Sequence, residues 1–131
     1  MELKPKSYDK IAQLVAKGVD IRNPLTLDIG EEVNIEHISK DMVTIYPDCR
    51  IYGEKTVISA GSKIGYEGSV TIDNCQLGPE VELKGGYFNK SVFLEKSSMG
   101  LGAHVREGSI LEEQASGAHC VGLKQTILMS F

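Results

Sequence analysis

The sequence contains no tryptophan, and aromatic residues make up only 6% of the chain. A core of ordinary size normally depends on aromatic side chains, so we expect this one to be filled by small and branched aliphatic residues. The three cysteines lie far apart and form no C-x-x-C pair, so they indicate neither a disulfide framework nor a zinc ribbon. No apolar run approaches the roughly 18 residues of a membrane span, so we expect no membrane partner.

Positive charge is also scarce. Lysine and arginine number 14 against 18 acidic residues, which gives a net charge of -4, and no basic block occurs. This balance argues against a nucleic-acid partner. The lysine pair near the N-terminus is not followed by an apolar stretch, so it does not form a signal peptide, and we expect a cytoplasmic protein.

Glycine, in contrast, is plentiful, with 14 residues, and the apolar residues follow a six-residue period. Each hexad begins with an aliphatic residue, often continues with glycine, and has a small or branched residue at its fifth place. The clearest run starts at Ile58 and continues at Ile64, and we assign further hexads that start at Leu77, Leu101 and Leu111.

A six-residue period is typical of a triangular solenoid. The first residue of each hexad points inward from a short strand, and the fifth, also inward, must be small because the corner is crowded. Three hexads close one coil, and coils stack at the strand spacing of about 4.8 Å. A β-sandwich is the alternative, but it requires alternation and turn signals every 8–12 residues, which are weaker here.

The first twenty residues have a different pattern, and we predict two domains, an N-terminal helix and lead-in at 1–20 and the solenoid at 21–131. Ser7 can cap a helix that places Ile11, Leu14 and Val15 on one face, and Gly18 stands where a left-handed stop is usual. This helix is expected to pack against one end of the solenoid.

The six-residue period is interrupted at 36–44 and at 85–92. We expect a corner insertion at the first segment and a looser coil at the second. Cys49 and Cys75 occupy fifth positions, so burial is the expected role of both thiols.

The hexads resemble those of the left-handed β-helix hexapeptide-repeat acyltransferases. The likeness is greatest to the later half of the bifunctional N-acetylglucosamine-1-phosphate uridyltransferase/glucosamine-1-phosphate N-acetyltransferase family. Two stretches carry it: "GVDIRNPLTLDIGEEV" at 18–33 and "GLGAHVREGSILEEQASGAHCVGLKQTIL" at 100–128. The resemblance implies an all-β, left-handed parallel β-helix with a short N-terminal α-helix, assembled as a homotrimer.

The resemblance also implies an anion site. The arginine of the family's Arg-Pro-Gly motif falls on Arg106, and the lysine of its Met-Lys-Lys motif falls on Lys124. These residues are three hexads apart, so one coil stacks them on the same face, and both can donate hydrogen bonds to one phosphate. The alternative is that both are solvated charges. Glu107 and Gln125 depart from the family motifs.

The family's catalytic histidine follows two hexads after its lysine, beyond Phe131, so no catalytic residue is assigned and we expect the solenoid to be truncated at its C-terminal end. No glycine-rich nucleotide loop is present, which excludes a pyrophosphorylase domain in this chain. The sequence therefore predicts the substrate-binding part of a sugar-phosphate N-acetyltransferase-like protein for a hexosamine phosphate or nucleotide sugar, with acetyl-CoA as the implied donor. A non-catalytic oligomerisation or regulatory scaffold is the alternative, and whether the chain belongs to an enzyme is left open.

No metal is expected. The γ-class carbonic anhydrases share this fold and bind zinc with three histidines, two of them close in sequence. His37, His104 and His119 lack that short spacing.

Overall fold

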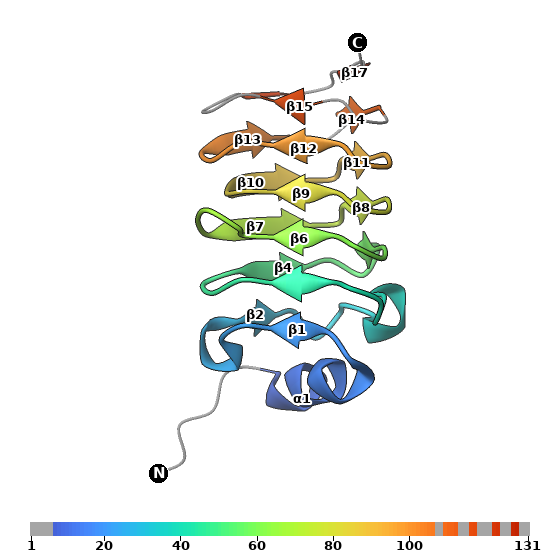
Figure 1. The fold of residues 1–131 in the computed structure, drawn as a ribbon, viewed down its shortest axis with the longest axis vertical. Coiled ribbons are helices and arrows are strands. Elements are labelled where there is room, and N and C mark those ends of the chain that lie inside the picture. The colour runs from blue at the N-terminus through green and yellow to red at the C-terminus, as the bar shows by residue number, and fades with distance from the viewer. Residues whose placement is uncertain (1–6, 107–108, 113–115, 118–121, 124–126, 129–131) are drawn as a thin grey trace.

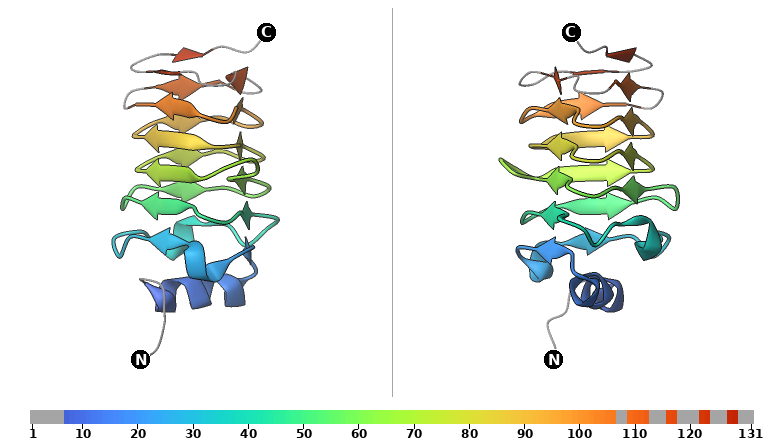
Figure 2. Two further views of the ribbon diagram at one scale, coloured as in Figure 1. Left: turned by 90° about the vertical axis from the view of Figure 1, so that its left-hand side faces the viewer. Right: turned by 45° about the vertical axis from the view of Figure 1, so that its right-hand side comes forward.

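A computed structural model describes residues 7–106, 109–112, 116–117, 122–123 and 127–128. These residues form a β-solenoid with one helix across its first coil (Figure 1). Every strand pair is parallel, and the strands of successive coils stack into three sheets that make the flat sides of a prism (Figure 2). The predicted parallel solenoid is confirmed, whereas its left-handed sense stays a prediction of the family resemblance.

Within the described residues, the sheets contain six, six and five strands. Sheet 1 consists of β1 (Asp20–Ile21), β3 (Thr44–Ile45), β6 (Lys63–Ile64), β9 (Glu82–Leu83), β12 (Ser98–Met99) and β15 (Ser116–Gly117). Sheet 2 consists of β2 (Asp28–Ile29), β4 (Arg50–Tyr52), β7 (Val70–Asp73), β10 (Gly86–Asn89), β13 (Ala103–Val105) and β16 (Gly122–Leu123). Sheet 3 consists of β5 (Val57–Ile58), β8 (Gln76–Leu77), β11 (Val92–Phe93), β14 (Ile110–Leu111) and β17 (Ile127–Leu128).

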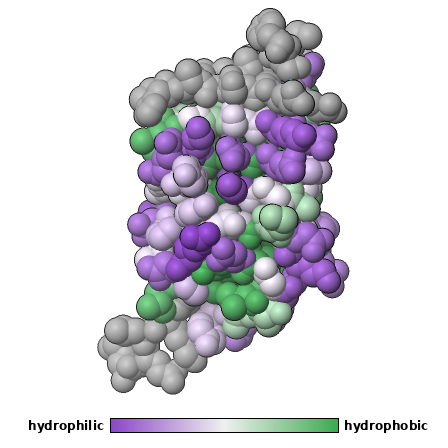
Figure 3. Space-filling view, viewed as in Figure 1, coloured by the Kyte–Doolittle hydropathy of each residue, from purple (hydrophilic) through white to green (hydrophobic). Residues whose placement is uncertain are grey.

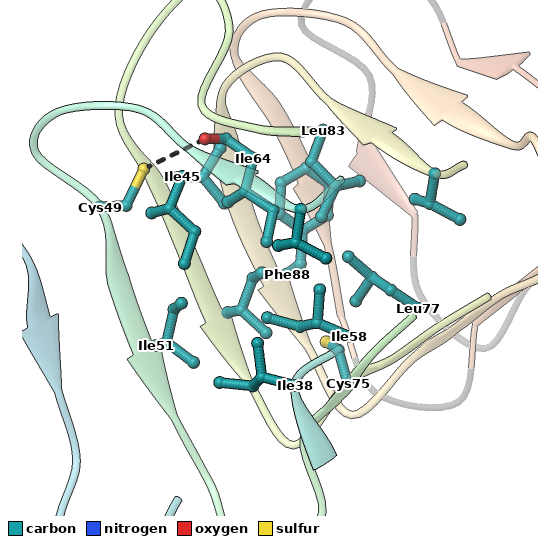
Figure 4. Packing of buried hydrophobic residues seen from close by; sticks show 14 of the residues in the cluster. Ile38, Ile45, Cys49, Ile51, Ile58, Ile64, Cys75, Leu77, Leu83 and Phe88 are labelled. Atoms are coloured by element: carbon teal, nitrogen blue, oxygen red, sulfur yellow. Dashed lines mark hydrogen bonds between the residues drawn. The ribbon is translucent and has the colours of Figure 1, made fainter. Parts of the chain in front are cut away.

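The hexads position the core as predicted. First and fifth residues are both buried along the run that contains Ile58, Ser62 and Ile64, while the residues between them are more exposed. Figure 4 shows the interior, in which aliphatic side chains of successive coils stack on one another and Phe88 supplies a ring. Cys49 and Cys75 are free thiols buried at fifth positions, which confirms their expected role.

One hexad boundary was predicted wrongly. Leu101 is half-exposed in a turn, whereas Met99, Ala103 and Val105 are buried, so the hexad begins at Met99 and Ala103 is its fifth residue. Met99 and Leu101 are both apolar and both precede a glycine, so composition does not distinguish them. The side chain of Leu101 instead lies over Gly85 at the corner of the preceding coil.

The irregular segment at 36–44 is a corner insertion. It contains the end of a 3-10 helix, η2 (Ile35–His37), after which Ile38 rejoins sheet 3 through a parallel bridge to Ile58. A second 3-10 helix, η1 (Pro24–Thr26), forms another corner.

The looser coil expected at 85–92 is not found. Strand β10 is four residues long and pairs with β7 and β13 on its two sides. The irregular sequence reflects a tight approach, because Gly86 has a φ of 128° and a Cβ there would collide with the carbonyl of Ala103.

Helix α1 (Tyr8–Lys17) packs against the first coil as predicted, with Ile11 and Leu14 buried. Gly18 has a φ of 118°, and its N–H donates to the carbonyl of Leu14, which ends the helix. Two other expectations were wrong. Ser7 adopts a left-handed conformation and makes no side-chain capping bond, and Val15 is 48% exposed because it lies beyond the edge of the buried face.

Two lysines of α1 bind the first coil of the solenoid. The ammonium of Lys10 donates to the carbonyl of Val33 at 2.6 Å, and that of Lys17 to the carbonyl of Ile35 at 2.7 Å. The carbonyl of Ile35 also accepts the N–H of Ile38, so Lys17 adds a second donor to it.

Candidate functional site

Arg106 directly follows β13 on the outer face of sheet 2. Ala103 and Val105 are buried and His104 is exposed, so the alternation of the strand places Arg106 outside, where it is exposed. The hydroxyl of Ser91 is within hydrogen-bond distance of the carbonyl oxygens of Arg106, at 2.7 Å, and Asn89, at 2.8 Å. The backbone that carries the guanidinium group is therefore held against the preceding coil.

The register of the next coil matches the predicted interval. Strand β13 pairs with β16 so that His104 lies opposite Gly122 and Val105 opposite Leu123. Each pair is separated by three hexads, the same interval that separates Arg106 from Lys124. Lys124 lies outside the described residues, so the stacked arginine–lysine pair stays a prediction.

An aromatic pair lies beside Arg106. Tyr87 of β10 pairs with His104 of β13, and the centroids of the two rings are 5.0 Å apart with the planes tilted by 55°. Tyr87 is 37% exposed, and His104 is exposed. His104 lies outward as predicted, but Tyr87 was missed, because the coil between these strands is one residue shorter than three hexads. Counting three hexads back from His104 leads to Gly86 instead of Tyr87.

An unpaired acceptor lies in the same region. Asn89 follows Phe88, which pairs with Val105, so Asn89 lies across the ladder from Arg106. Among the described residues, its side-chain oxygen is buried without a hydrogen-bond partner. A buried acceptor that lacks a partner costs about 1–3 kcal/mol.

The opposite end of sheet 2 is acidic. A hollow of about 660 Å³ is lined there by Asp28, Glu31, Glu32 and Tyr52. The hydroxyl of Tyr52 donates to Asp28 at 2.6 Å, and this bond raises the pKa of the tyrosine. The amide of Gly53 donates to Glu32 at 2.8 Å, which lowers the pKa of that carboxyl group. An anion on this sheet is therefore repelled from the β2 end.

Sheet 1 carries a larger groove, of about 690 Å³ (Figure 3). Its two lysines already have carboxylate neighbours, since Lys63 lies 3.9 Å from Glu82 and Lys96 lies 3.7 Å from Glu80. Both pairs are exposed and contribute little energy. Figure 3 shows hydrophilic residues over the middle of this face and hydrophobic residues gathered below. With Asp20, the lining has three carboxylates and two lysines, so this groove has no preference for an anion.

The buried cysteines are unsuited to nucleophilic chemistry. Burial raises the pKa of Cys75 to about 11 and also raises the pKa of Cys49. Both thiols are therefore protonated at neutral pH.

Metal ligands do not converge in the part of the chain that the structure describes. His37 and His104 are both exposed, and His119 lies outside the described residues. Over the same part of the chain, no helix has the length and apolar character needed to cross a membrane.

The fold and its six-residue repeat define a hexapeptide-repeat β-solenoid. Within that class, the chain is related to proteins named Bifunctional protein GlmU. It is 34% identical to the one from Staphylococcus haemolyticus over 111 residues, 32% identical to the one from Thermotoga maritima over 119 residues, and 28% identical to the one from Trichlorobacter lovleyi over 117 residues. The resemblance to the hexapeptide-repeat acyltransferase superfamily is thus confirmed.

These alignments cover 85%, 91% and 88% of this chain but only 23%, 25% and 24% of the three relatives, in the same order. The chain therefore spans about a quarter of the length of the curated relatives that it matches. No protein-family model matches the chain.

Proposed function

We propose that this chain is the substrate-binding part of a sugar-phosphate N-acetyltransferase-like protein, with Arg106 and Lys124 as the phosphate ligands. The observation that carries the proposal is the register of β13 and β16. It pairs residues at the interval that separates the arginine from the lysine, in a chain related to the GlmU proteins.

The electrostatics of the proposed pair favour an anion. Strands of successive coils lie about 4.8 Å apart, so two stacked cations repel each other. A phosphate removes this repulsion by accepting hydrogen bonds from both, and guanidinium is suited to bidentate contact with phosphate oxygens. Asp28 and Glu32 lie toward the other end of sheet 2 and compete little with such a ligand, whereas Asp73, which pairs with Asn89, lies closer to Arg106.

The rest of the reaction is implied by the family resemblance. The proposed substrate is a hexosamine phosphate or nucleotide sugar, and acetyl-CoA is the proposed acyl donor. The general base that removes a proton from the attacking amine would be supplied from outside this chain. We further propose that the chain acts as a homotrimer, in which the flat faces of neighbouring prisms bury surface that a single narrow solenoid exposes.

The test is a calorimetric titration with glucosamine-1-phosphate and with UDP-N-acetylglucosamine. The native chain is compared with Arg106→Ala and Lys124→Ala, and with Arg50→Ala as a matched control. Arg50 is also exposed on the outer face of sheet 2, but it lies on β4. We expect binding by the native chain and by Arg50→Ala, and loss of binding in the other two variants.

Two results would contradict the proposal. Equal weakening in all three variants would mean that only the net charge matters. No heat with either ligand at millimolar concentrations would leave Arg106 a solvated charge and favour a non-catalytic oligomerisation or regulatory scaffold.

A further inference from the structure

We infer that Tyr87 and His104 form a platform for the pyranose ring of the ligand whose phosphate Arg106 binds. This inference rests on the proposed function and adds two residues that select the ligand. It starts from the outer face of sheet 2, where both side chains are exposed and their rings lie 5.0 Å apart. The Tyr87 ring and the imidazole each present apolar ring surface against which the C–H groups of a sugar can pack.

The spacing between platform and cation fits a phosphate attached directly to a sugar. His104 and Arg106 are separated by one residue on β13 and its extension, so their Cα atoms are about 6.6 Å apart along the strand. A pyranose ring and its own phosphate can span such a distance. A nucleobase is separated from its phosphate by a ribose, which places the base further along the face.

The tilt of the rings also favours a sugar. Two planes inclined at 55° form a shallow V instead of one flat surface. A puckered pyranose chair can contact both sides of a V, whereas a planar base would stack on only one ring. The residue opposite His104 on the next coil is Gly122, which adds no side chain above the imidazole.

The polar groups beside the platform suit the rim of a sugar. The unpaired side-chain oxygen of Asn89 lies across the ladder from Arg106, and a rotation of that amide would offer an acceptor to a hydroxyl or amino group. Thr71 and Asp73 on β7 pair with Tyr87 and Asn89, respectively, and continue this polar surface. The aromatic pair is thus bordered by a cation on one strand and by hydrogen-bonding groups on two others.

Calorimetry with three probes tests the platform on the full chain, namely N-acetylglucosamine-1-phosphate, inorganic phosphate and uridine monophosphate. We expect Tyr87→Leu to weaken binding of the sugar phosphate about five-fold and to leave inorganic phosphate unchanged, while Tyr87→Phe keeps the native affinity. Arg106→Ala should lose both ligands. Tyr66→Leu is the control, because Tyr66 is an exposed tyrosine at a corner that follows a strand of sheet 1.

A second measurement does not depend on any variant. The imidazole resonances of His104 should shift on addition of the sugar phosphate and move much less with inorganic phosphate.

The outcomes separate the platform from the proposed function. If Tyr87→Leu binds the sugar phosphate as well as the native chain does, the platform is wrong and the phosphate site stands. If uridine monophosphate binds more tightly and alone depends on Tyr87, the pair selects a base and the pyranose assignment is overturned. If no sugar phosphate binds the native chain, both ideas are overturned.

Discussion

Replacing Gly86 with alanine should destabilise the solenoid at the coil that carries Tyr87. The φ of 128° belongs to a region that a side chain opposes, and such strain costs about 1–3 kcal/mol. The added Cβ also collides with the carbonyl of Ala103 on the adjacent strand. Moving that carbonyl disturbs the pairing of β10 with β13 at a further cost of about 1–3 kcal/mol. Alanine recovers roughly 0.4–1 kcal/mol by restricting the unfolded chain.

The net loss in the free energy of unfolding is therefore about 3 kcal/mol. At roughly 4 °C per kcal/mol for a chain of this size, the melting temperature should fall by about 12 °C. Thermal melting followed by far-UV circular dichroism measures the shift, and a urea titration checks it independently. The displacement of β10 should also separate Tyr87 from His104.

The neighbouring glycine supplies the control. A Cβ on Gly85 would meet chiefly the terminal methyl group of Leu101, a half-exposed side chain that can rotate away. Gly85→Ala should therefore cost less than about 1 kcal/mol. The reasoning is refuted if Gly86→Ala melts within about 3 °C of the native protein, or if the two variants are equally destabilised.

Three further predictions concern the core, the thiols and the helix. Ile72→Ala should cost about 2–5 kcal/mol because Ile72 is fully buried, whereas Val15→Ala on the exposed side of α1 should stay within about 0.5 kcal/mol, both measured by urea denaturation. Cys75 has a folded pKa of about 11, above its ordinary value of 9.0, so its contribution to stability is complete below pH 9 and declines as the pH rises toward 11. Urea titrations across that range should show the decline in the native protein and lack this component in Cys75→Ala. The double substitution Lys10→Met and Lys17→Met should lower the free energy of unfolding by about 2 kcal/mol, because two backbone carbonyls lose charged donors.

Each of these has a clear contrary result. A cost for Val15→Ala as large as that for Ile72→Ala would contradict the placement of Val15 on the exposed side of α1. A stability that is flat through pH 9–11 would contradict a buried, protonated thiol. A loss from the exposed Lys55→Met as large as that from the double variant would show that net charge, and not carbonyl contact, explains the helix result.

The hexads predicted the architecture because inward positions tolerate few residue types. Ile58, Ser62 and Ile64 followed from that rule, as did the burial of Cys75. The rule failed at Leu101, where neighbouring apolar–glycine pairs satisfy it equally well and only packing against Gly85 selects the turn.

The candidate site was only partly predictable for a related reason. Arg106 was identified by its motif resemblance, and its exposure followed from strand alternation. Tyr87 could not be paired with His104 from the sequence, because coil length varies at the corners and the period counts only complete hexads. Which residues of two adjacent coils lie side by side depends on the length of every corner between them. Which residues point into the core depends only on the pattern within one hexad.

Helix α1 also has a consequence for self-association. A stack of parallel strands ends in open backbone groups, and these can template a strand from another molecule. Because α1 lies across that end and its lysines bind the carbonyls of Val33 and Ile35, growth of a fibre in this direction is blocked. The helix therefore acts as a stop for polymerisation, and lateral contact between prism faces is left as the safer route to an oligomer.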